Sequence, residues 1–253
     1  MSKCKLALVA DAVFVLSVRT FTERIKHIEQ HFSDLGVDFE FIFDFDPPEL
    51  TDEYLTEHFG ESDMAIPHKS LVLKHMQAWR LGIERGCKRI LVFEDDVILN
   101  KGFCLGLYQV IDEINKLPEG YLIFLGGSDT KVSDDFFLHH GPLIPQPIAT
   151  TEGYLCDTEA LNRRFEWLHK NKICLPADHL IKHIDEACGT LHYWLEKPLV
   201  QQGSVSGKFG TVLDANRKKH SRYYNIVRYR WNQFRRRKLK KWVVKVRSWL
   251  GFS

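Results

Sequence analysis

Short apolar runs alternate along the chain with amphipathic stretches. Residues 13–16, 90–93 and 121–125 are continuously apolar, which predicts strands buried on both faces, as in a parallel sheet covered by helices. Residues 37–43 alternate between apolar and polar side chains and predict a further strand, and residues 150–155 predict a short one. The sheet is therefore expected to be assembled from strands far apart in the chain.

Helical periodicity fills the segments between these runs. We expect one helix after a Thr20 or Thr22 cap, one that Thr158 caps and that runs to Leu168, and others over 67–85, 102–116 and 180–188. The strand-helix alternation predicts an α/β fold with a nucleotide-binding type of sheet. Neither a G-x-G-x-x-G motif nor a P-loop lysine is present, so dinucleotide oxidoreductases and P-loop enzymes fit poorly. Residues 129–149 predict a long loop, either a functional lid or a disordered segment.

Three adjacent acids, Glu94, Asp95 and Asp96, follow the central apolar run. Side chains alternate along a strand, so Glu94 and Asp96 are expected on one side and Asp95 on the other. Three crowded carboxylates repel one another, and water or a cation must offset that repulsion. Because ligands bind at the carboxyl ends of strands in open α/β sheets, the triplet predicts a divalent metal site for a phosphorylated substrate. The alternative is a solvated acidic turn.

Other polar residues have both a functional and a structural explanation. Arg19 lies in a strand-to-helix loop, where it either meets a phosphate or is a surface arginine. His75 stands in an apolar helical stripe, where a histidine is usually a core residue, although it could face the site. The triplet from Asp44 to Asp46 resembles a metal-binding D-x-D motif, which we discount because two prolines follow at once.

The composition is that of an ordinary soluble protein, and 253 residues allow one large domain or one domain with an appendage. The six cysteines are scattered without the close pairs of a zinc site, which predicts reduced thiols in a cytosolic protein. The apolar stretch at residues 6–10 is too short for a signal peptide and is interrupted by Asp11. No apolar run is long enough to span a bilayer.

The net charge of +2 conceals two opposite parts. Residues 217–253 contain 14 Lys and Arg and no acid, so residues 1–216 carry 35 − 14 = 21 cations against 33 acids, a net −12. Apolar residues recur at helical spacing in this segment, and its cations lie mostly on the other side. Interfacial helices have this composition, so we expect it to meet an anionic membrane surface. A nucleic-acid-binding tail and a helix packed on the acidic body are the alternatives.

From about Phe14 to Ser206 the order and spacing of motifs resemble glycosyltransferase family 25, the bacterial lipopolysaccharide and lipooligosaccharide sugar transferases. The resemblance is carried by Arg19 and Arg24 after the first strand, His75 with Trp79, the run Arg89 to Val97, Thr151 with Tyr154, Pro176 with Asp178, and Pro198 to Val200 with Gln202 and Ser204. Leu71 and Lys74 stand where the family usually has Cys and Ser. The segment Thr150 to Tyr154 replaces the usual Gly-Thr-His-Ala-Tyr.

The resemblance implies a GT-A-like fold, with a mixed, mostly parallel sheet flanked by helices. It also implies a nucleotide-sugar donor, most often UDP-galactose, and Mn²⁺ or Mg²⁺ at the diphosphate. Glu94 and Asp96 are the expected metal ligands, and Asp95 is expected to bind ribose or position the loop. The remaining donor-binding residues expected from the resemblance are Arg19, Arg24, His75, Thr151, Gln202 and Ser204.

An inverting transfer needs a base at hydrogen-bond range of the acceptor hydroxyl. Asp178 is the first candidate, because it begins a helix after the long loop, and Glu152 is the second. Asp178 has a structural explanation as well, since the helix dipole stabilises a carboxylate in a first turn. The expected reaction transfers a hexose, galactose in the first instance, to a lipooligosaccharide or lipopolysaccharide acceptor.

We expect two parts, a catalytic domain over 1–210 and a membrane-associating basic tail over 211–253. The expected location is the cytoplasm, at the inner face of the cytoplasmic membrane, with a lipid-linked oligosaccharide as acceptor and no nucleic acid as partner. Two rival functions use the same features. A non-enzymatic nucleic-acid-binding protein would use the basic tail, and a metal-dependent nucleotide-diphosphate phosphohydrolase would use the acidic triplet.

Overall fold

A computed structural model of the chain describes residues 6–127, 129–147, 150–206, 209 and 221–250. Strand β3 (Arg89–Glu94) lies inside its main sheet, and the apolar side chains of this strand alternate between two hydrophobic clusters. Ile90 and Val92 belong to one cluster, and Leu91 and Phe93 belong to the other. All four are fully buried. The apolar run 90–93 therefore forms the predicted strand, with both of its faces covered.

The sheet has seven strands in the order β2-β1-β3-β7-β5-β8-β6. Besides β3 these are β1 (Ala12–Leu16), β2 (Glu40–Ile42), β5 (Tyr121–Phe124), β6 (Leu143–Pro145), β7 (Gly153–Asp157) and β8 (Leu191–Leu195). Strand β1 is parallel to β2 and β3, and β5 is parallel to β8, whereas β7 is antiparallel to both β3 and β5 and β6 is antiparallel to β8. Five strands therefore run the same way, and the predicted mixed, mostly parallel sheet is confirmed.

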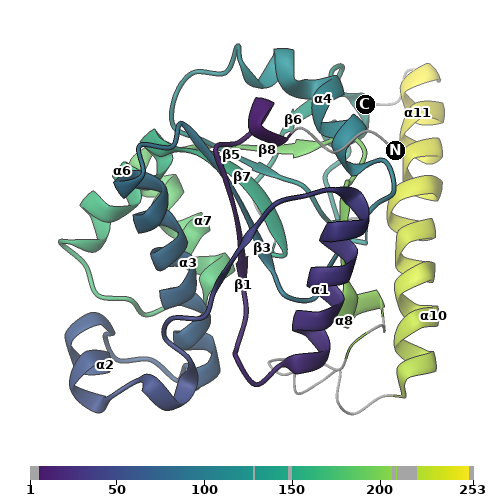
Figure 1. Cartoon of the computed structure of the whole chain (residues 1–253). Helices are drawn as coiled ribbons and strands as arrows, with labels where there is room; N and C mark the ends of the chain where they lie inside the picture. The colour runs from purple at the N-terminus through teal and green to yellow at the C-terminus, as the bar shows by residue number, and fades with distance from the viewer. Residues whose placement is uncertain (1–5, 128, 148–149, 207–208, 210–220, 251–253) are drawn as a thin grey trace.

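Helices cover both faces of this sheet (Figure 1). One face is covered by α3 (Ile66–Glu84), α6 (Thr158–Leu168) and α7 (Ala177–Cys188), which contribute Trp79, Leu161 and Ile184 to the first cluster. The other face is covered by α1 (Thr22–Leu35) and α4 (Phe103–Ile114), which contribute Phe32 and Leu107 to the second cluster. The helix-flanked α/β fold class is thus confirmed, with the core divided into two layers by the sheet.

Two predicted helix caps are wrong. Helix α1 follows Phe21, which makes no side-chain cap, so neither Thr20 nor Thr22 serves as one. At α6 the cap is Asp157, which accepts from the Ala160 N–H at 3.1 Å. The Thr158 hydroxyl instead donates to the Cys87 carbonyl. Thr158 therefore makes a tertiary hydrogen bond in place of the cap that the local pattern predicts.

Regular structure also occurs outside the predicted elements. The predicted loop 129–149 includes α5 (Asp135–Leu138) and β6, and the stretch 47–58, where no element is predicted, includes a 3-10 turn (Pro47–Glu49) and α2 (Asp52–His58). A second sheet pairs β4 (Val97–Leu99) antiparallel with β9 (Val200–Gln202), and α8 (Gly203–Ser206) follows. In that sheet Val97 lies opposite Gln202. This pairing brings residues 202–204 next to the acidic triplet.

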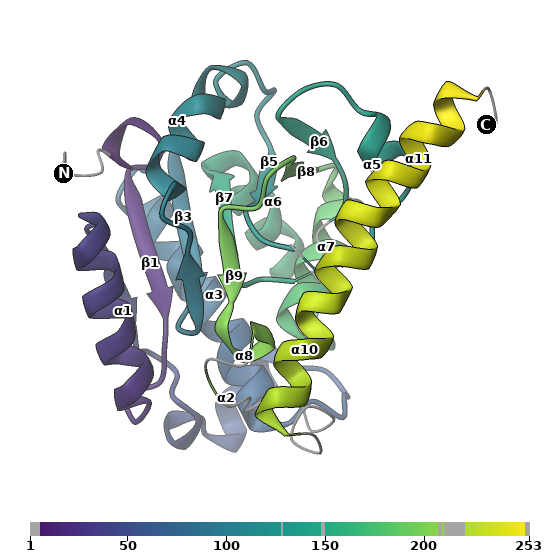
Figure 2. The same cartoon turned by 90° about the vertical axis from the view of Figure 1, so that its right-hand side faces the viewer.

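The basic tail forms the predicted helix. Helix α10 (Arg222–Gln233), a π-helical turn (Phe234–Leu239) and α11 (Lys240–Trp249) follow one another, and Figure 2 shows them running diagonally past α8 and α5. Tyr229 and Val244 are buried, so one face of the tail packs on the body. The expected domain boundary at 210–211 lies outside the described residues. No described helix is both long and apolar enough to cross a membrane.

Four cysteines, Cys87, Cys156, Cys174 and Cys188, are free thiols. Cys104 is disulfide-bonded, so the prediction of reduced thiols is wrong for this residue. Scattered spacing did not reveal this bond, because a disulfide depends on proximity in space rather than in sequence.

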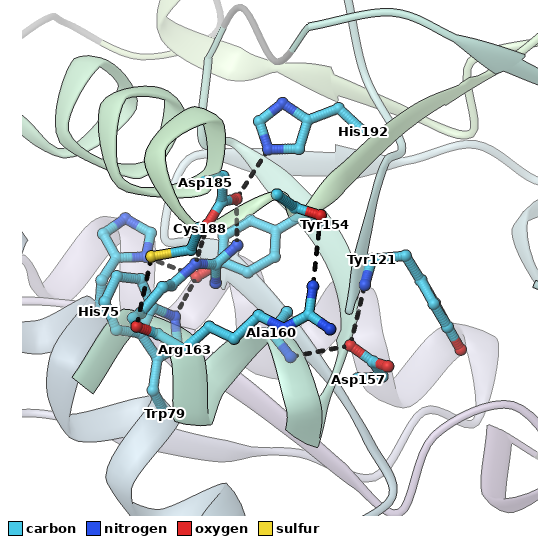
Figure 3. A network of polar contacts seen from close by, with 12 residues as sticks. His75, Trp79, Tyr121, Tyr154, Asp157, Ala160, Arg163, Asp185, Cys188 and His192 are labelled. Carbon is cyan, nitrogen blue, oxygen red and sulfur yellow. Dashed lines mark hydrogen bonds and ion pairs between the residues drawn. The ribbon is translucent and has the colours of Figure 1, made fainter. Parts of the chain in front are cut away.

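A buried ion pair lies between α6 and α7 (Figure 3). The Arg164 guanidinium donates to both carboxylate oxygens of Asp185 at 2.8 and 2.7 Å, and both side chains are completely buried. His192 lies 2.7 Å from the same carboxylate. Burial of a charge is tolerated when it is paired in this way, and the pair fixes α6 against α7.

His75 belongs to this buried region rather than to a surface cavity. Its Nδ1 lies 2.9 Å from the Tyr154 hydroxyl, which also accepts from the Trp79 indole N–H at 2.8 Å (Figure 3). The residue is 1% exposed. Burial, and next the positive charge of Arg164, lower the pKa of His75 to about 3. We therefore assign a neutral core histidine here, which argues against the predicted contact with a donor.

The low pKa of His75 predicts a pH-dependent stability. Between its folded value of about 3 and the ordinary 6.5, the unfolded chain binds a proton that the folded chain does not. Stability contributed by neutral His75 is therefore present above pH 6.5 and is lost as the pH falls, by about 1.4 kcal/mol per pH unit at most. Urea unfolding of wild type and His75→Gln across this range measures the effect.

Below pH 6.5 the His75→Gln variant should lose less unfolding free energy per pH unit than wild type does. His139→Gln removes an exposed histidine and is the matched control, which should retain the wild-type slope. Equal slopes for His75→Gln and wild type would contradict the assignment of a neutral, buried imidazole.

Candidate functional site

A cavity of about 600 Å³ opens at the sheet edge where β1 and β3 end. Parallel β1 and β3 place their carboxyl ends together, and antiparallel β7 begins beside them, with Gly153 opposite Phe93. The cavity lining includes most of the predicted site residues, namely Arg24, Glu94, Asp95, Asp96, Thr151, Asp178, Gln202 and Ser204. Arg19, His75 and Glu152 are not part of the lining.

Glu94 is held at the end of β3 by a neighbouring hydroxyl. Thr151 Oγ1 donates to Glu94 Oε1 at 2.5 Å. Burial, and next the negative charge of Asp96, raise the pKa of Glu94 to about 8. A carboxyl in this state gains most from a nearby positive charge, because a cation offsets both causes of the shift.

Asp95 points to a different set of partners, as strand alternation predicts. It accepts from the Ser17 hydroxyl at 2.8 Å and from Arg24 Nη1 at 2.6 Å. Burial raises its pKa, and the Arg24 charge opposes that rise. The described contacts thus use Asp95 to join the ends of β1 and β3 to α1, which agrees with the predicted positioning of the loop and gives no support to ribose binding.

Asp96 is held by backbone donors on one side only. Its Oδ2 accepts from the Ser204 N–H at 3.0 Å, and its carbonyl accepts from the Gly203 N–H at 2.7 Å. Its Oδ1 is buried and has no hydrogen-bond partner among the described residues. A buried carboxylate oxygen without a donor is costly, so Oδ1 is suited to a ligand or cation.

The carboxylates fit a hard divalent cation that is held mainly by a substrate. The described part of the chain contains no group of three or more His, Cys, Asp or Glu side chains arranged to hold a metal ion. Mg²⁺ usually takes one or two protein carboxylates and completes its shell with water and substrate phosphates. Glu94 and the unpartnered Asp96 Oδ1 supply such a pair.

Glu152 lies behind the cavity lining. Its Oε1 accepts from the Gly127 N–H at 3.1 Å, whereas Oε2 is buried without a partner among the described residues. Its carbonyl accepts from the Glu94 N–H at 3.2 Å. Burial raises the pKa of Glu152 to about 7, and the charge of Asp96 acts in the same direction. Glu152 is therefore placed to support Glu94 from behind rather than to face the cavity.

Asp178 faces the cavity from the first turn of α7. Its side chain is 34% exposed and accepts from the His179 N–H at 2.9 Å. Helix α7 begins after Pro176, so Asp178 is its second residue. Asp178 is thus the accessible one of the two predicted bases.

Arg19 and Asp46, the second acid of the discounted D-x-D motif, bind each other and neighbouring residues. The Arg19 N–H donates to Asp46 Oδ2 at 2.9 Å, and its guanidinium lies 4.9 Å from the centre of the Phe43 ring. Asp46 is buried, and its other oxygen pairs with Lys74. Both Asp46 oxygens are therefore used, one by the Arg19 N–H and one by Lys74 of α3, which agrees with the discounting of this motif as a metal site.

Lys74 is the residue of the site that sequence reasoning missed. It is 2% exposed, lines the cavity, and donates to Asp46 Oδ1 at 2.7 Å and to the carbonyls of Phe43 and Asp44 at 3.0 and 2.8 Å. Burial lowers its pKa. The signal was present, because a lysine inside an apolar helical stripe needs a buried partner. Lys74 fixes the Phe43–Asp46 loop against α3.

The chain is similar to several curated proteins. It is 23% identical over 135 residues to a glycosyltransferase 25 family member of Drosophila melanogaster, a match that covers 49% of this chain and 22% of that protein. It is 28% identical over 92 residues to the lacto-N-neotetraose biosynthesis glycosyltransferase LgtE of Neisseria gonorrhoeae, covering 35% of this chain and 33% of that protein. The matches thus span about a fifth to a third of the length of these relatives.

Among solved structures, one similar chain is a glycosyltransferase involved in the glycosylation of the major capsid of PBCV-1, with a TM-score of 0.44 and 13% identity over 87% of this chain and 99% of that one. Another is the galactosyltransferase LgtC in complex with donor and acceptor sugar analogues, with a TM-score of 0.37 and 8% identity over 86% of this chain and 95% of that one.

Residues 10–140 match the sequence model of the family described as "Glycosyltransferase family 25 (LPS biosynthesis protein)". The matched segment runs from β1 to the loop after α5 and contains the acidic triplet at the end of β3. Because this match extends over more than half of the 253 residues, the chain belongs to glycosyltransferase family 25.

Proposed function

We propose that the protein is a metal-dependent glycosyltransferase that moves a hexose from a UDP-sugar to a lipooligosaccharide or lipopolysaccharide acceptor. One observation carries this proposal: Glu94, at the end of a buried strand, and Asp96, two residues later, line a cavity of about 600 Å³ that Asp178 also lines. Family membership supports the transferase reaction. The family description supports a lipopolysaccharide acceptor.

The donor is proposed to lie along the edge formed by β1, β3 and β9. Gln202 and Ser204 line the cavity beside Asp96 and offer hydrogen bonds to a nucleotide, and Thr151 fixes Glu94. Galactose is the proposed sugar, because UDP-galactose is the donor that the family resemblance implies. The relative LgtE, which is named for lacto-N-neotetraose biosynthesis, supports an oligosaccharide acceptor.

Glu94 and Asp96 are proposed to hold Mn²⁺ or Mg²⁺. The metal, when bound, stabilises the negative charge that develops on the departing diphosphate. One Asp96 oxygen has no donor among the described residues and is therefore available to the ion, while the Ser204 N–H orients the other oxygen. Arg24 neutralises Asp95, which reduces the repulsion within the triplet.

Asp178 is the proposed base for an inverting transfer. It lines the cavity with a partly exposed carboxylate, which suits a group that takes a proton from an acceptor hydroxyl. Glu152 is less suited, because it is 4% exposed and one of its oxygens is bound to Gly127. We therefore rank Asp178 first for the base and give Glu152 a supporting role.

The tail is proposed to hold the enzyme on the inner face of the cytoplasmic membrane. Its outward surface, here called the aromatic stripe, consists of the exposed residues Tyr223, Tyr224, Val227, Trp231, Phe234, Leu239, Trp242, Trp249 and Leu250. Exposed cations accompany the stripe, namely Arg228, Arg230, Arg235, Lys238, Lys245 and Arg247. Tryptophan and tyrosine favour the headgroup region, and cations favour anionic lipid.

Some cations of the tail face the body and not a membrane. The cations of the tail were expected to meet a membrane surface, but four of them bind the body instead, namely Arg236, Arg237, Lys240 and Lys241. These side chains are consequently less available to nucleic acid. The six exposed cations remain for an anionic leaflet, at about 1 kcal/mol each near the surface, which is sufficient for reversible docking.

The reaction and the metal pair are tested by comparing single variants with UDP-galactose and Mn²⁺. Asp96→Asn should lower transfer by about 100-fold or more, because it removes a charged ligand. Asp44→Asn, an exposed acid of the discounted D-x-D motif, is the matched control and should stay within about twofold of wild type. Equal activity of Asp96→Asn and Asp44→Asn would refute the metal assignment, and donor turnover without an acceptor requirement would favour the phosphohydrolase.

In the same assay Asp178→Asn should lower kcat by about 10²–10⁴-fold while the KM for the donor changes little, because a general base acts in the chemical step. Asp52→Asn removes an acid from the first turn of α2 and controls for a purely helix-stabilising role. If Asp178→Asn retains wild-type kcat, its role as the base is wrong.

Membrane docking is tested by flotation of the full chain with vesicles of phosphatidylcholine, with or without phosphatidylglycerol. Wild type should float with the anionic vesicles, and high salt should weaken this binding. Replacing Trp231, Trp242 and Trp249 together by Ala should lower the bound fraction by about tenfold. Leu105→Ala removes an exposed apolar residue of α4 and should have no effect. Flotation that is equal for the triple variant and wild type would exclude the aromatic stripe as the docking surface.

A further inference from the structure

The inward face of the tail forms hydrogen bonds with the segment that follows β5. Arg236 Nη1 donates to the Asp129 carbonyl at 3.0 Å, and Lys240 Nζ donates to the Val132 carbonyl at 2.5 Å. Between these two cations, Arg237 Nη2 donates to the Gly127 carbonyl. Three tail cations therefore bind three carbonyls of one segment, here called the β5 loop (residues 126–132).

Arg237 is the most enclosed of these cations. Its guanidinium lies 4.8 Å from the ring centre of Phe136 and 5.3 Å from that of Trp194. Burial lowers the pKa of Arg237 to about 10, so the side chain bears a desolvation cost. Such a cost is tolerated where a charge has a fixed position among aromatic faces and carbonyl oxygens.

The tail changes its helical geometry at this point. The π-helical turn Phe234–Leu239 contains both Arg236 and Arg237. A π-helical turn alters the angular spacing of side chains, and such turns are frequent at functional sites. Both arginines consequently reach the body, whereas Trp231 and Trp242 on either side of the turn remain 57% and 65% exposed.

The residue that Arg237 holds, Gly127, also contacts Glu152. The carbonyl of Gly127 accepts from Arg237, and its N–H donates to Glu152 Oε1 at 3.1 Å. Gly127 has a φ of +78°, and a Cβ on Gly126 would lie 2.1 Å from the same Glu152 oxygen. The two glycines thus allow the loop backbone to close around this carboxylate.

Glu152 in turn lies next to the proposed metal pair. Its carbonyl accepts from the Glu94 N–H at 3.2 Å, and its neighbour Thr151 donates to the Glu94 carboxylate. The contacts therefore form a continuous path from the tail through Gly127 and Glu152 to the end of β3.

We propose that Arg237 is a positioning residue of the reaction centre, which acts by fixing the backbone of Gly127 so that the Gly127 N–H holds Glu152 behind Glu94 and Asp96. This inference rests on the proposed function for its kinetic consequence. The tail then has two separate faces, an outward one for the membrane and an inward one for the catalytic cavity.

The first experiment measures amide hydrogen exchange in the β5 loop of the full chain and needs no activity. Arg237→Gln should speed exchange in the peptide that contains Gly127 by about tenfold or more, while the sheet strands retain their protection. Arg80→Gln, which removes an exposed arginine of α3, is the matched control and should match wild type. If exchange at Gly127 is unchanged in Arg237→Gln, Arg237 does not fix the Gly127 backbone, whatever reaction the protein catalyses.

The second experiment is a double-mutant cycle with UDP-galactose, Mn²⁺ and a lipooligosaccharide acceptor. Arg237→Gln and Glu152→Gln should each lower kcat by about tenfold or more, with a smaller change in the donor KM, and the double variant should resemble the single ones. A merely structural role of Arg237 predicts additive losses or an unchanged kcat, and either result would overturn the proposal. If wild type transfers no sugar, the proposed function fails, and the exchange experiment still decides whether Arg237 fixes the Gly127 backbone.

Discussion

Crowding of carboxylates at the end of a strand buried on both faces is the constraint on which the site depends. Strand β3 takes its side chains into two hydrophobic clusters, so the acids that follow it start in an environment poor in water. Asp95 is neutralised by Arg24, and Asp96 is held by the Ser204 N–H. Glu94 and one Asp96 oxygen are left with unfavourable electrostatics that a divalent cation relieves.

The elements around this triplet come from distant parts of the chain. Antiparallel β7 begins beside the end of β3 and brings Thr151 and Glu152, whereas β9 pairs with β4 and brings Gln202 and Ser204. The tail then closes on the β5 loop through Arg237. Because one helix carries both this contact and the aromatic stripe, the proposed attachment to a membrane and the proposed support of the cavity are combined in a single element.

Local pattern was sufficient for the buried strands, the helices on both faces and the acidic triplet, because continuous apolar runs and helical periodicity record burial directly. It was not sufficient where a side chain has a distant partner. Lys74 binds Asp46 and His75 binds Tyr154. Thr158 donates its hydroxyl to the Cys87 carbonyl and does not cap a helix. The pairing of β4 with β9 and the inward cations of the tail were missed for the same reason, since composition shows which residues are charged but not what faces them.

The most direct test of the central claim is a crystal structure of the protein with Mg²⁺ and UDP. We expect the ion about 2.1 Å from a carboxylate oxygen of Asp96, near Glu94, and in contact with the diphosphate. A nucleotide bound elsewhere, or a diphosphate in this cavity with its ion remote from Asp96, would contradict the account.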